Sequence, residues 1–274
     1  MVSYFHNNKF VFFGTPEFAA IILEKLIQTG MAPALVICNP DRPVGRKKII
    51  TAPPAKIIAQ KYGVNIWQPE NLELEIKEIK NRVFDFFVVA AYSKILPKEI
   101  LAIPRLSTIG IHPSLLPKYR GTTPIQNAIL AGEKETGVTL FLTDEKVDHG
   151  PILAKRELRM TNDDNYDNLQ KRLAALGADL LIETLPKFLA GEIKPQPQDE
   201  SKATYTKKFR IEDAFIDLNG EPEIILRKIK ALNPEPGVWT IQNGKRMKIL
   251  DAEIKDGKLK LKKIQVEGKK AKNL

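Results

Sequence analysis

The segment Ile109–Gly121 (IGIHPSLLPKYRG) contains His112, one of only three histidines, directly after a short stretch with β-strand character. An imidazole accepts or donates a proton near neutral pH, so a histidine in a loop at a strand end is a candidate general base. Further along, Val147–Pro151 (VDHGP) places Asp148 beside a Gly-Pro turn. A carboxylate that contacts the imidazole would orient it and favour its protonated form. The alternative, a structural histidine and an ordinary turn residue, stays open because sequence separation does not establish contact.

The elements before His112 are typical of a parallel α/β sheet. An aromatic and β-branched strand ends at Gly14, and the following Thr-Pro-Glu predicts the start of a helix. Further apolar strands are expected at Ala34–Cys38, Phe84–Ala91 and Ser107–Ile111. This pattern predicts an α/β fold with a doubly wound, mostly parallel sheet in the N-terminal domain. Ligands bind at the carboxyl ends of such strands, where Gly14, Tyr92 and His112 would all lie.

The C-terminal part has a different pattern. Pro195–Ser201 (PQPQDES) is typical of a linker, so we expect domains at 1–192 and 207–274 joined by a linker at 193–206. Three alternating segments after it are separated by Asn-Gly and Asp-Gly pairs, which are strong hairpin signals. A small, mostly β, barrel-like domain is therefore expected.

Composition places the chain among globular proteins of the cytoplasm. It has 274 residues, 43% of them hydrophobic and 28% charged, and no apolar run approaches the roughly 20 residues that span a bilayer. Cys38 is the only cysteine, which fits a reducing compartment. From Ile241 to Leu274 there are eleven Lys or Arg against four Asp or Glu, so much of the net charge of +10 lies in this segment. Such a block attracts polyanions, although the charge taken alone slightly favours a solvated, lysine-rich face without a partner.

Several motifs together resemble the folate-dependent formyltransferases. HPSLLP at residues 112–117, Arg120-Gly121 and DHGP at residues 148–151 resemble the wider family. Similarity to the branch that acts on methionyl-tRNA lies in FGTPEFA at residues 13–19, PDRPVGR at residues 40–46, and the shorter motifs Ala91-Tyr92, Ala203-Thr204-Tyr205 and Leu232-Asn233-Pro234. The similarity runs in order along nearly the whole chain. It implies transfer of a formyl group from 10-formyltetrahydrofolate to the α-amine of initiator methionyl-tRNA.

The resemblance also implies roles for individual residues. His112 and Asp148 match the imidazole and carboxylate that carry the chemistry, and Gly110 occupies a third catalytic position. The folate pocket would be formed by Ala90, Ala91, Tyr92, Ser114, Leu115, Leu116 and Pro117. Contacts to tRNA would come from the polar loop between Asn39 and Pro54, through Arg42, Arg46, Lys47 and Lys48. For Arg42, a turn that shapes the loop is as good an interpretation as an RNA contact.

Gly110 is also where the sequence departs from the family, which has an asparagine there. Residues two apart in a strand face the same side, so position 110 faces the reaction together with His112 but offers no amide. Loss of one oxyanion donor costs roughly 10²–10³ in rate. The enzyme could be slow, Gln126, Asn127 or a water could replace the donor, or the chain could bind its ligands without efficient transfer. We favour replacement of the donor. The C-terminal domain is also shorter than the family leads one to expect.

Two other functions are compatible with parts of the sequence. An amino-sugar or glycinamide-ribonucleotide formyltransferase would share the His-Pro motif but would need neither the arginine-bearing loop nor a basic second domain. A weakened folate- or tRNA-binding homologue is supported only by Gly110. No metal site is expected, because His6, His112, His149 and one cysteine lack the spacing of metal ligands. We expect a monomer without membrane contact.

Overall fold

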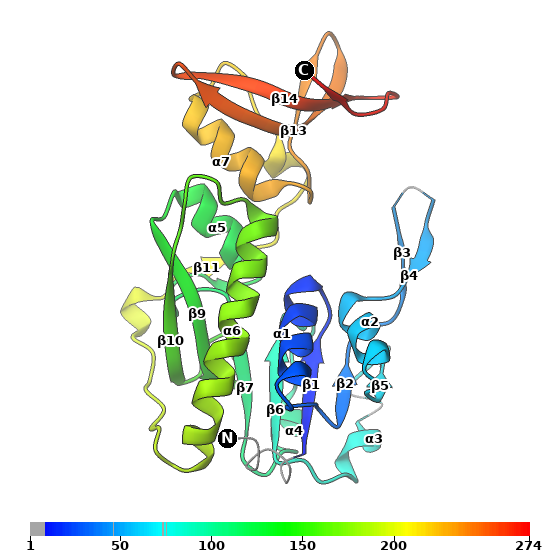
Figure 1. Ribbon diagram of the computed structural model, residues 1–274, viewed down its shortest axis with the longest axis vertical. Coiled ribbons are helices and arrows are strands. Elements are labelled where there is room, and N and C mark those ends of the chain that lie inside the picture. The colour runs from blue at the N-terminus through cyan, green and yellow to red at the C-terminus, as the bar shows by residue number, and fades with distance from the viewer. Residues whose placement is uncertain (1–8, 46, 73, 75) are drawn as a thin grey trace. The chain divides into compact units, whose positions relative to one another are not determined.

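The computed structural model describes residues 9–45, 47–72, 74 and 76–274, and these divide into two compact units. The first unit comprises residues 1–120, 137–158 and 170–204, and the second comprises residues 121–136, 159–169 and 205–274. The expected α/β class is confirmed, and so is a separate sheet in the C-terminal part (Figure 1). His6 lies outside the described residues.

The first unit is built on a seven-stranded sheet with the order β10-β9-β7-β6-β1-β2-β5. From β7 to β5 the neighbouring strands are parallel, whereas β9 runs antiparallel to β7. The strands are β1 (Phe10–Gly14), β2 (Leu35–Ile37), β5 (Ile66–Trp67), β6 (Phe86–Ala90), β7 (Ser107–His112), β9 (Glu135–Leu142) and β10 (Ile152–Arg159). Gly14 is paired with Ala90 and Ala90 with Ile111, so β1, β6 and β7 end at one edge.

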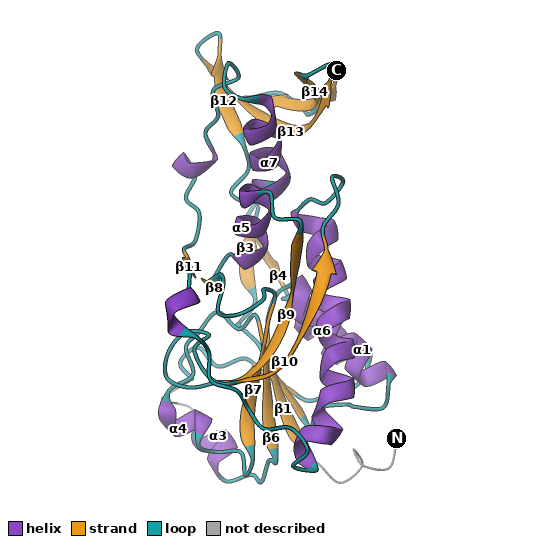
Figure 2. Cartoon of the chain, turned by 90° about the vertical axis from the view of Figure 1, so that its left-hand side faces the viewer, coloured by secondary structure: helices purple, strands orange, loops and turns teal. Residues whose placement is uncertain are grey.

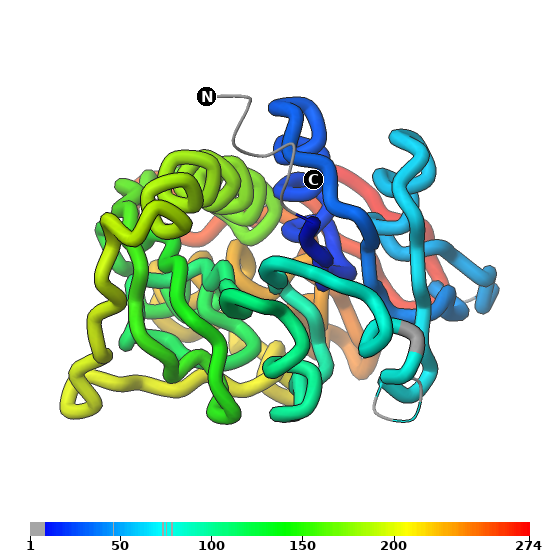
Figure 3. The backbone as a smooth tube through the Cα atoms, turned by 90° about the horizontal axis from the view of Figure 1, so that it is seen from below, coloured from blue at the N-terminus to red at the C-terminus, as the bar shows by residue number. Residues whose placement is uncertain are grey.

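Helices cover both faces of this sheet, as expected for a doubly wound fold. Figure 3 shows α1 and α6 on one side and α4 on the other. The helices are α1 (Glu17–Gln28), α2 (Pro54–Lys61), α3 (Lys77–Lys80), α4 (Lys98–Leu101) and α6 (Tyr166–Leu189), with a 3-10 turn η2 (Glu200–Lys202). Because a side chain at Gly177 of α6 would meet Ile111 and Val138 at 3.0 and 3.3 Å, this glycine lets the helix pack closely on β7 and β9.

Alternate residues of the strands supply the core. Val11 and Phe13 of β1, Ile37 of β2 and Phe87 of β6 point to the face covered by α3 and α4. There they pack with Leu72, Ile79, Phe84, Tyr92, Leu96 and Ile100. This buried core supports the sheet edge at which β7 ends with His112.

The second unit contains an open antiparallel sheet and two helices. Its sheet has the order β12-β13-β14-β15, and the predicted hairpins at Asn243-Gly244 and Asp256-Gly257 are present. The elements are α5 (Pro124–Ala131), η3 (Glu212–Ala214), α7 (Pro222–Leu232), β12 (Trp239–Gln242), β13 (Lys245–Lys255), β14 (Lys258–Val266) and β15 (Lys272–Asn273) (Figure 2). Helix α7 packs against α5 and β13. Among the described residues this sheet is open rather than closed into a barrel.

Two short pairs complete the structure. The strands β3 (Arg42–Val44) and β4 (Ile49–Thr51) form a hairpin where the sequence predicts an irregular loop. That prediction was wrong for a physical reason: β-branched residues at Val44, Ile49 and Ile50 favour extended backbone, and Gly45 adopts the positive φ of 70° that the turn needs. The other pair is β8 (Arg120–Gly121) with β11 (Tyr205–Thr206).

Candidate active site

His112, the last residue of β7, lies next to Asp148. Its Nδ1 atom is 3.5 Å from Oδ2 of Asp148, and its side chain is 7% exposed against 20% for the aspartate. The two residues are far apart in sequence, and the convergence predicted for them is confirmed. Their catalytic role stays a prediction.

A hydrogen bond of His112 indicates which of its ring nitrogens carries the hydrogen in the neutral ring. Its Nε2 lies 2.8 Å from the carbonyl oxygen of Tyr119. A carbonyl oxygen can only accept, so Nε2 carries the hydrogen and donates it. In the neutral ring, Nδ1 is then the basic atom, and it faces the Asp148 carboxylate. A proton taken up at Nδ1 would create an imidazolium held between this carboxylate and the Tyr119 carbonyl.

The loop that carries Asp148 is tightly constrained. Asp148 itself has a φ of 49°, in the left-handed region that residues with a side chain adopt uncommonly. Two residues later, a Cβ at Gly150 would lie 1.7 Å from the carbonyl oxygen of Leu142, so only glycine fits where the loop passes the end of β9. The Asp148 carboxylate is therefore presented by a backbone with little freedom.

Gly110 does not face open space beside His112. In the antiparallel pairing of β7 with β9 it lies opposite Phe141, and a Cβ on Gly110 would lie 2.4 and 2.5 Å from the ring atoms Cε1 and Cζ of Phe141. The ring is 4% exposed. The expectation that position 110 faces the reaction needs this correction: the space for an asparagine side chain is filled by an aromatic ring.

The two proposed replacements for the missing amide belong to the second unit. The amide nitrogen of Asn127 donates to the carbonyl oxygen of Thr123 at 2.8 Å and to its Oγ1 at 2.9 Å. Its donors are thus used within the first turn of α5. Replacement by Asn127 or by Gln126 stays a prediction.

The expected folate loop is held by hydrogen bonds from β9 and β10. Ser114 and Leu116 are buried, at 1% and 0% exposed, whereas Leu115 and Pro117 are partly exposed. Thr139 of β9 donates to the Ser114 carbonyl at 2.7 Å and accepts from the Leu116 amide at 3.0 Å. The Lys155 ammonium of β10 donates to the Leu116 carbonyl, and burial lowers the pKa of this lysine. The backbone groups of Ser114 and Leu116 are thus bonded within the protein and fix the course of this loop.

The second expected folate segment leaves the end of β6. Ala90 is buried in the sheet, and Ala91 is exposed with a φ of 47°. Tyr92 turns into the core, 8% exposed, with its ring 5.5 Å from that of Phe13 in an edge-on contact. Its backbone rather than its ring would be offered at the sheet edge.

Three of the four residues expected to bind tRNA lie in the segment of the β3–β4 hairpin. Arg42, Lys47 and Lys48 are exposed, and Arg46 lies outside the described residues. The base of the hairpin is fixed by Asp41, which accepts from Lys56 at 2.8 Å and from Gln68 at 2.9 Å. The hydrogen bond from Lys56 lowers the pKa of the Asp41 carboxyl. Whether Arg42 shapes the loop or contacts RNA stays a prediction.

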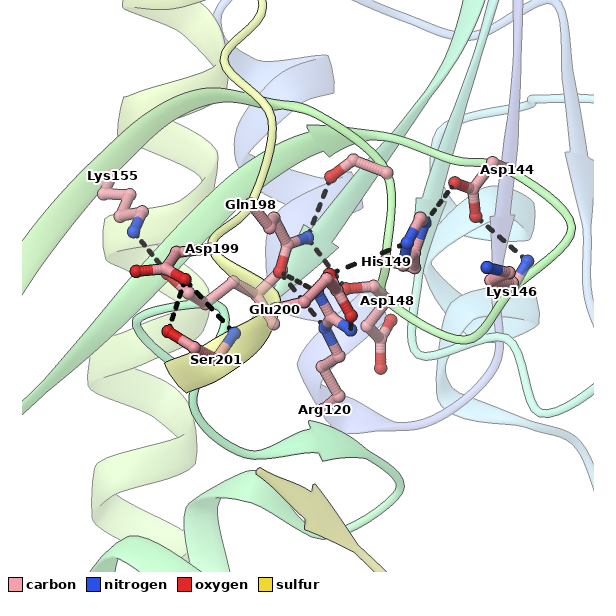
Figure 4. Close-up of polar contacts among 12 residues, drawn as sticks. Arg120, Asp144, Lys146, Asp148, His149, Lys155, Gln198, Asp199, Glu200 and Ser201 are labelled. Atoms are coloured by element: carbon pink, nitrogen blue, oxygen red, sulfur yellow. Dashed lines mark hydrogen bonds and ion pairs between the residues drawn. The ribbon is translucent and has the colours of Figure 1, made fainter. Parts of the chain in front are cut away.

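Sequence reasoning missed the polar network around Arg120. This arginine is 0% exposed and is bound by Gln198 and Glu200, which lie in the expected linker (Figure 4). His149 points to Asp144, at 2.7 Å, and to Glu200, at 3.6 Å, rather than toward His112. The only available signal was an arginine within an otherwise apolar and proline-rich motif, which gave no hint of its partners.

Two negative findings concern the described residues alone. In them, no group of three or more His, Cys, Asp or Glu side chains is placed to hold a metal ion. A helix long and apolar enough to cross a membrane is likewise absent from the part of the chain that the structure describes.

Comparison with known proteins agrees with this geometry. Residues 8–185 match the formyl transferase family and residues 208–260 match the formyl transferase C-terminal domain. A methionyl-tRNA formyltransferase of Staphylococcus aureus (strain MW2) is 40% identical over 248 residues, which is 90% of this chain and 79% of that protein.

Two solved structures share the fold. HypX from Aquifex aeolicus, also solved in complex with tetrahydrofolic acid, has a TM-score of 0.71 at 18% identity and covers 98% of this chain, which spans 48% of that longer protein. Methionyl-tRNA formyltransferase from Clostridium thermocellum has a TM-score of 0.63 at 20% identity, covering 94% of this chain and 98% of that one. The sequence match over most of its length, with the His112–Asp148 pair at the sheet edge, makes this chain a member of the formyl transferase family.

Proposed function

We propose that this chain transfers the formyl group of 10-formyltetrahydrofolate to the α-amine of initiator methionyl-tRNA. The observation that carries the proposal is the 40% identity to a methionyl-tRNA formyltransferase over 90% of the chain. The arrangement around His112 supports the same chemistry. An amino sugar or glycinamide ribonucleotide is a weaker candidate for the formyl acceptor, because so small a molecule needs neither the exposed basic hairpin nor the basic C-terminal sheet.

The reaction needs one group that first accepts a proton and later donates the same proton. The amine lone pair attacks the formyl carbon, and the carbonyl electron pair moves to oxygen. The attacking nitrogen then loses a proton, which Nδ1 of His112 accepts while Nε2 keeps its bond to the Tyr119 carbonyl. Asp148, 3.5 Å from Nδ1, stabilises the imidazolium. The tetrahedral species collapses by breaking the bond to the folate nitrogen, which receives the proton from the imidazolium. The products are formyl-methionyl-tRNA and tetrahydrofolate.

The remaining residues have supporting roles in this proposal. The backbone of 90–92 contacts the folate, and the stretch 114–117 lines its pocket. Contacts to the acceptor end come from Arg42, Arg46, Lys47 and Lys48, and residues 207–274 bind the tRNA body. Catalysis is assigned to residues 1–192, with 193–206 as the connection. The enzyme acts as a monomer in the cytoplasm, where translation starts.

The test is a formylation assay with a choice of acceptors. The purified chain is given 10-formyltetrahydrofolate and charged initiator tRNA, an amino-sugar nucleotide or glycinamide ribonucleotide. We expect product only with the tRNA, and a rate about 10²–10⁴-fold lower for His112→Ala. Formylation of the sugar nucleotide at a comparable rate, or a His112→Ala variant as fast as the wild type, would refute the proposal.

A further inference from the structure

Gln198 connects the loop of Asp148 to the buried Arg120. Its Nε2 donates to the carbonyl oxygens of Asp148 at 2.9 Å and Gly150 at 2.8 Å. Its Oε1 accepts from Nε and Nη2 of Arg120 at 3.1 and 2.8 Å (Figure 4). Both amide hydrogens and both lone pairs of this side chain are therefore used.

Arg120 fixes Gln198 from the other side. Its guanidinium donates to both carboxylate oxygens of Glu200, at 2.9 and 2.6 Å. An arginine that is 0% exposed is costly without partners, so these contacts hold residues 198 and 200 in place. The Arg120 guanidinium also keeps the pKa of the Glu200 carboxyl below its usual range.

His112, the other member of the proposed catalytic pair, is bound by the residue that precedes Arg120. Tyr119, the neighbour of Arg120, accepts the Nε2 hydrogen bond of His112. The backbone amides of both residues are in turn bound by Thr204, at 2.8 Å each. The segment 198–204 therefore restrains His112 through Tyr119 and Asp148 through Gln198.

We propose that Gln198 is a positioning residue for Asp148: its two amide hydrogens hold the 148–150 backbone so that the carboxylate faces Nδ1 of His112. Arg120 and Glu200 keep Gln198 in the required orientation. The expected effect on kcat rests on the proposed function. The hydrogen bonds that hold the 148–150 backbone do not depend on that function. A displacement of about 1 Å in a reacting group costs about 10²-fold in rate, so loss of the two hydrogen bonds affects kcat rather than substrate binding.

Gln198→Glu separates positioning from simple structural support. The glutamate keeps the size of the side chain and the acceptor for Arg120, but it has no hydrogen to donate to the two carbonyls. Gln196→Met is the matched control for Gln198→Met, because the Gln196 side chain is exposed in the same segment and, among the described residues, donates only to the Lys194 carbonyl.

We expect Gln198→Glu to fold but to unfold at a lower urea concentration than the wild type, because two hydrogen bonds to backbone carbonyls are lost. Its kcat should fall by about 10–100-fold, with both KM values changed by less than about threefold. Gln198→Met should lose kcat as well, whereas Gln196→Met should not. In an Asp148→Asn background the Gln198→Glu change should cost less than about threefold, because the two residues act as one unit. A kcat within twofold of the wild type, or a loss that adds fully to that of Asp148→Asn, would overturn the proposal.

Hydrogen exchange gives a readout that does not depend on the substrate. Backbone amides in 144–151 should exchange at least about tenfold faster in Gln198→Glu than in Gln196→Met, because the loop has lost its restraint. Equal exchange in the two variants would refute the positioning role even if formylation of methionyl-tRNA fails. Faster exchange together with an inactive wild type would refute only the proposed function.

Discussion

Replacing Gly110 by asparagine should not by itself improve catalysis, because Phe141 blocks the side chain. The new Cβ would lie 2.4 Å from Cε1 and 2.5 Å from Cζ of a ring that is 4% exposed. Real contacts of this kind are far longer, so either β7 or the Phe141 ring must shift. Overpacking of a buried site typically costs about 1–3 kcal/mol. Gly110→Asn should therefore unfold at a lower urea concentration, and its rate gain should stay well short of the roughly 10²–10³-fold that an oxyanion donor contributes.

The double variant with Phe141→Leu tests the steric cause. Leucine is shorter than phenylalanine, so the pair should be more stable than the sum of the single effects by about 0.5–3 kcal/mol, the usual range for residues in contact. If the amide then reaches the oxyanion, formyl transfer should rise in the double variant and not in either single one. The assays are urea unfolding and single-turnover formylation of charged initiator tRNA. A Gly110→Asn variant with wild-type stability and a rate gain of two orders would refute this reasoning.

Three further predictions concern other parts of the chain. Burial raises the pKa of the Cys38 thiol to about 11, so at pH 8 the folded protein should react with a disulfide reagent far more slowly than the urea-unfolded chain, whose thiol has a pKa of about 8.5; equal rates would contradict this. Because the folded-state pKa of Glu200 is lowered, its pairing with Arg120 stabilises the fold above the unfolded pKa of about 4.3 and is lost as the pH falls below it. The difference in urea midpoint between wild type and Glu200→Gln should thus shrink toward pH 3, whereas a difference independent of pH would exclude the ion pair as its cause. Finally, tRNA affinity should fall steeply with salt, and Lys47→Ala should reduce the log–log slope by about 0.9 without changing the KM for folate; an unchanged slope would remove Lys47 from the interface.

Strand periodicity and motif spacing predict that His112 lies at the carboxyl end of a parallel strand in the first unit. Buried parallel strands appear in the sequence as continuous apolar runs, and their carboxyl ends meet at one edge, so an edge shared by Gly14, Tyr92 and His112 is predicted from the sequence. The pairing of Gly14 with Ala90 and of Ala90 with Ile111 agrees with it. The contact between His112 and Asp148 is only a hypothesis from the sequence, because no local sequence pattern specifies the path of the loop that carries Asp148.

The environment of Gly110 and the role of Gln198 could not be predicted for the same reason. Phe141 lies opposite Gly110 because of the register in which β7 pairs with β9, and no local signal in the sequence specifies that register. A stretch of proline, glutamine and acidic residues is typical of a solvated linker, yet Gln198 and Glu200 find a buried guanidinium as partner. The β3–β4 hairpin was missed because its prolines and basic residues outweighed three β-branched side chains.

The hydrogen bonds that Thr204 makes to Tyr119 and Arg120 bear on how the protein should be dissected into parts. A fragment cut at 192, the apparent end of the catalytic domain, would discard Gln198, Glu200 and Thr204 along with the C-terminal sheet. Loss of formyl transfer by that fragment would therefore not show that the sheet is needed, because the proposed positioning contacts are lost with it. A fragment that keeps residues up to 206 retains these contacts, but it still divides the second unit, because residues 121–136 and 159–169 belong with residues 205–274.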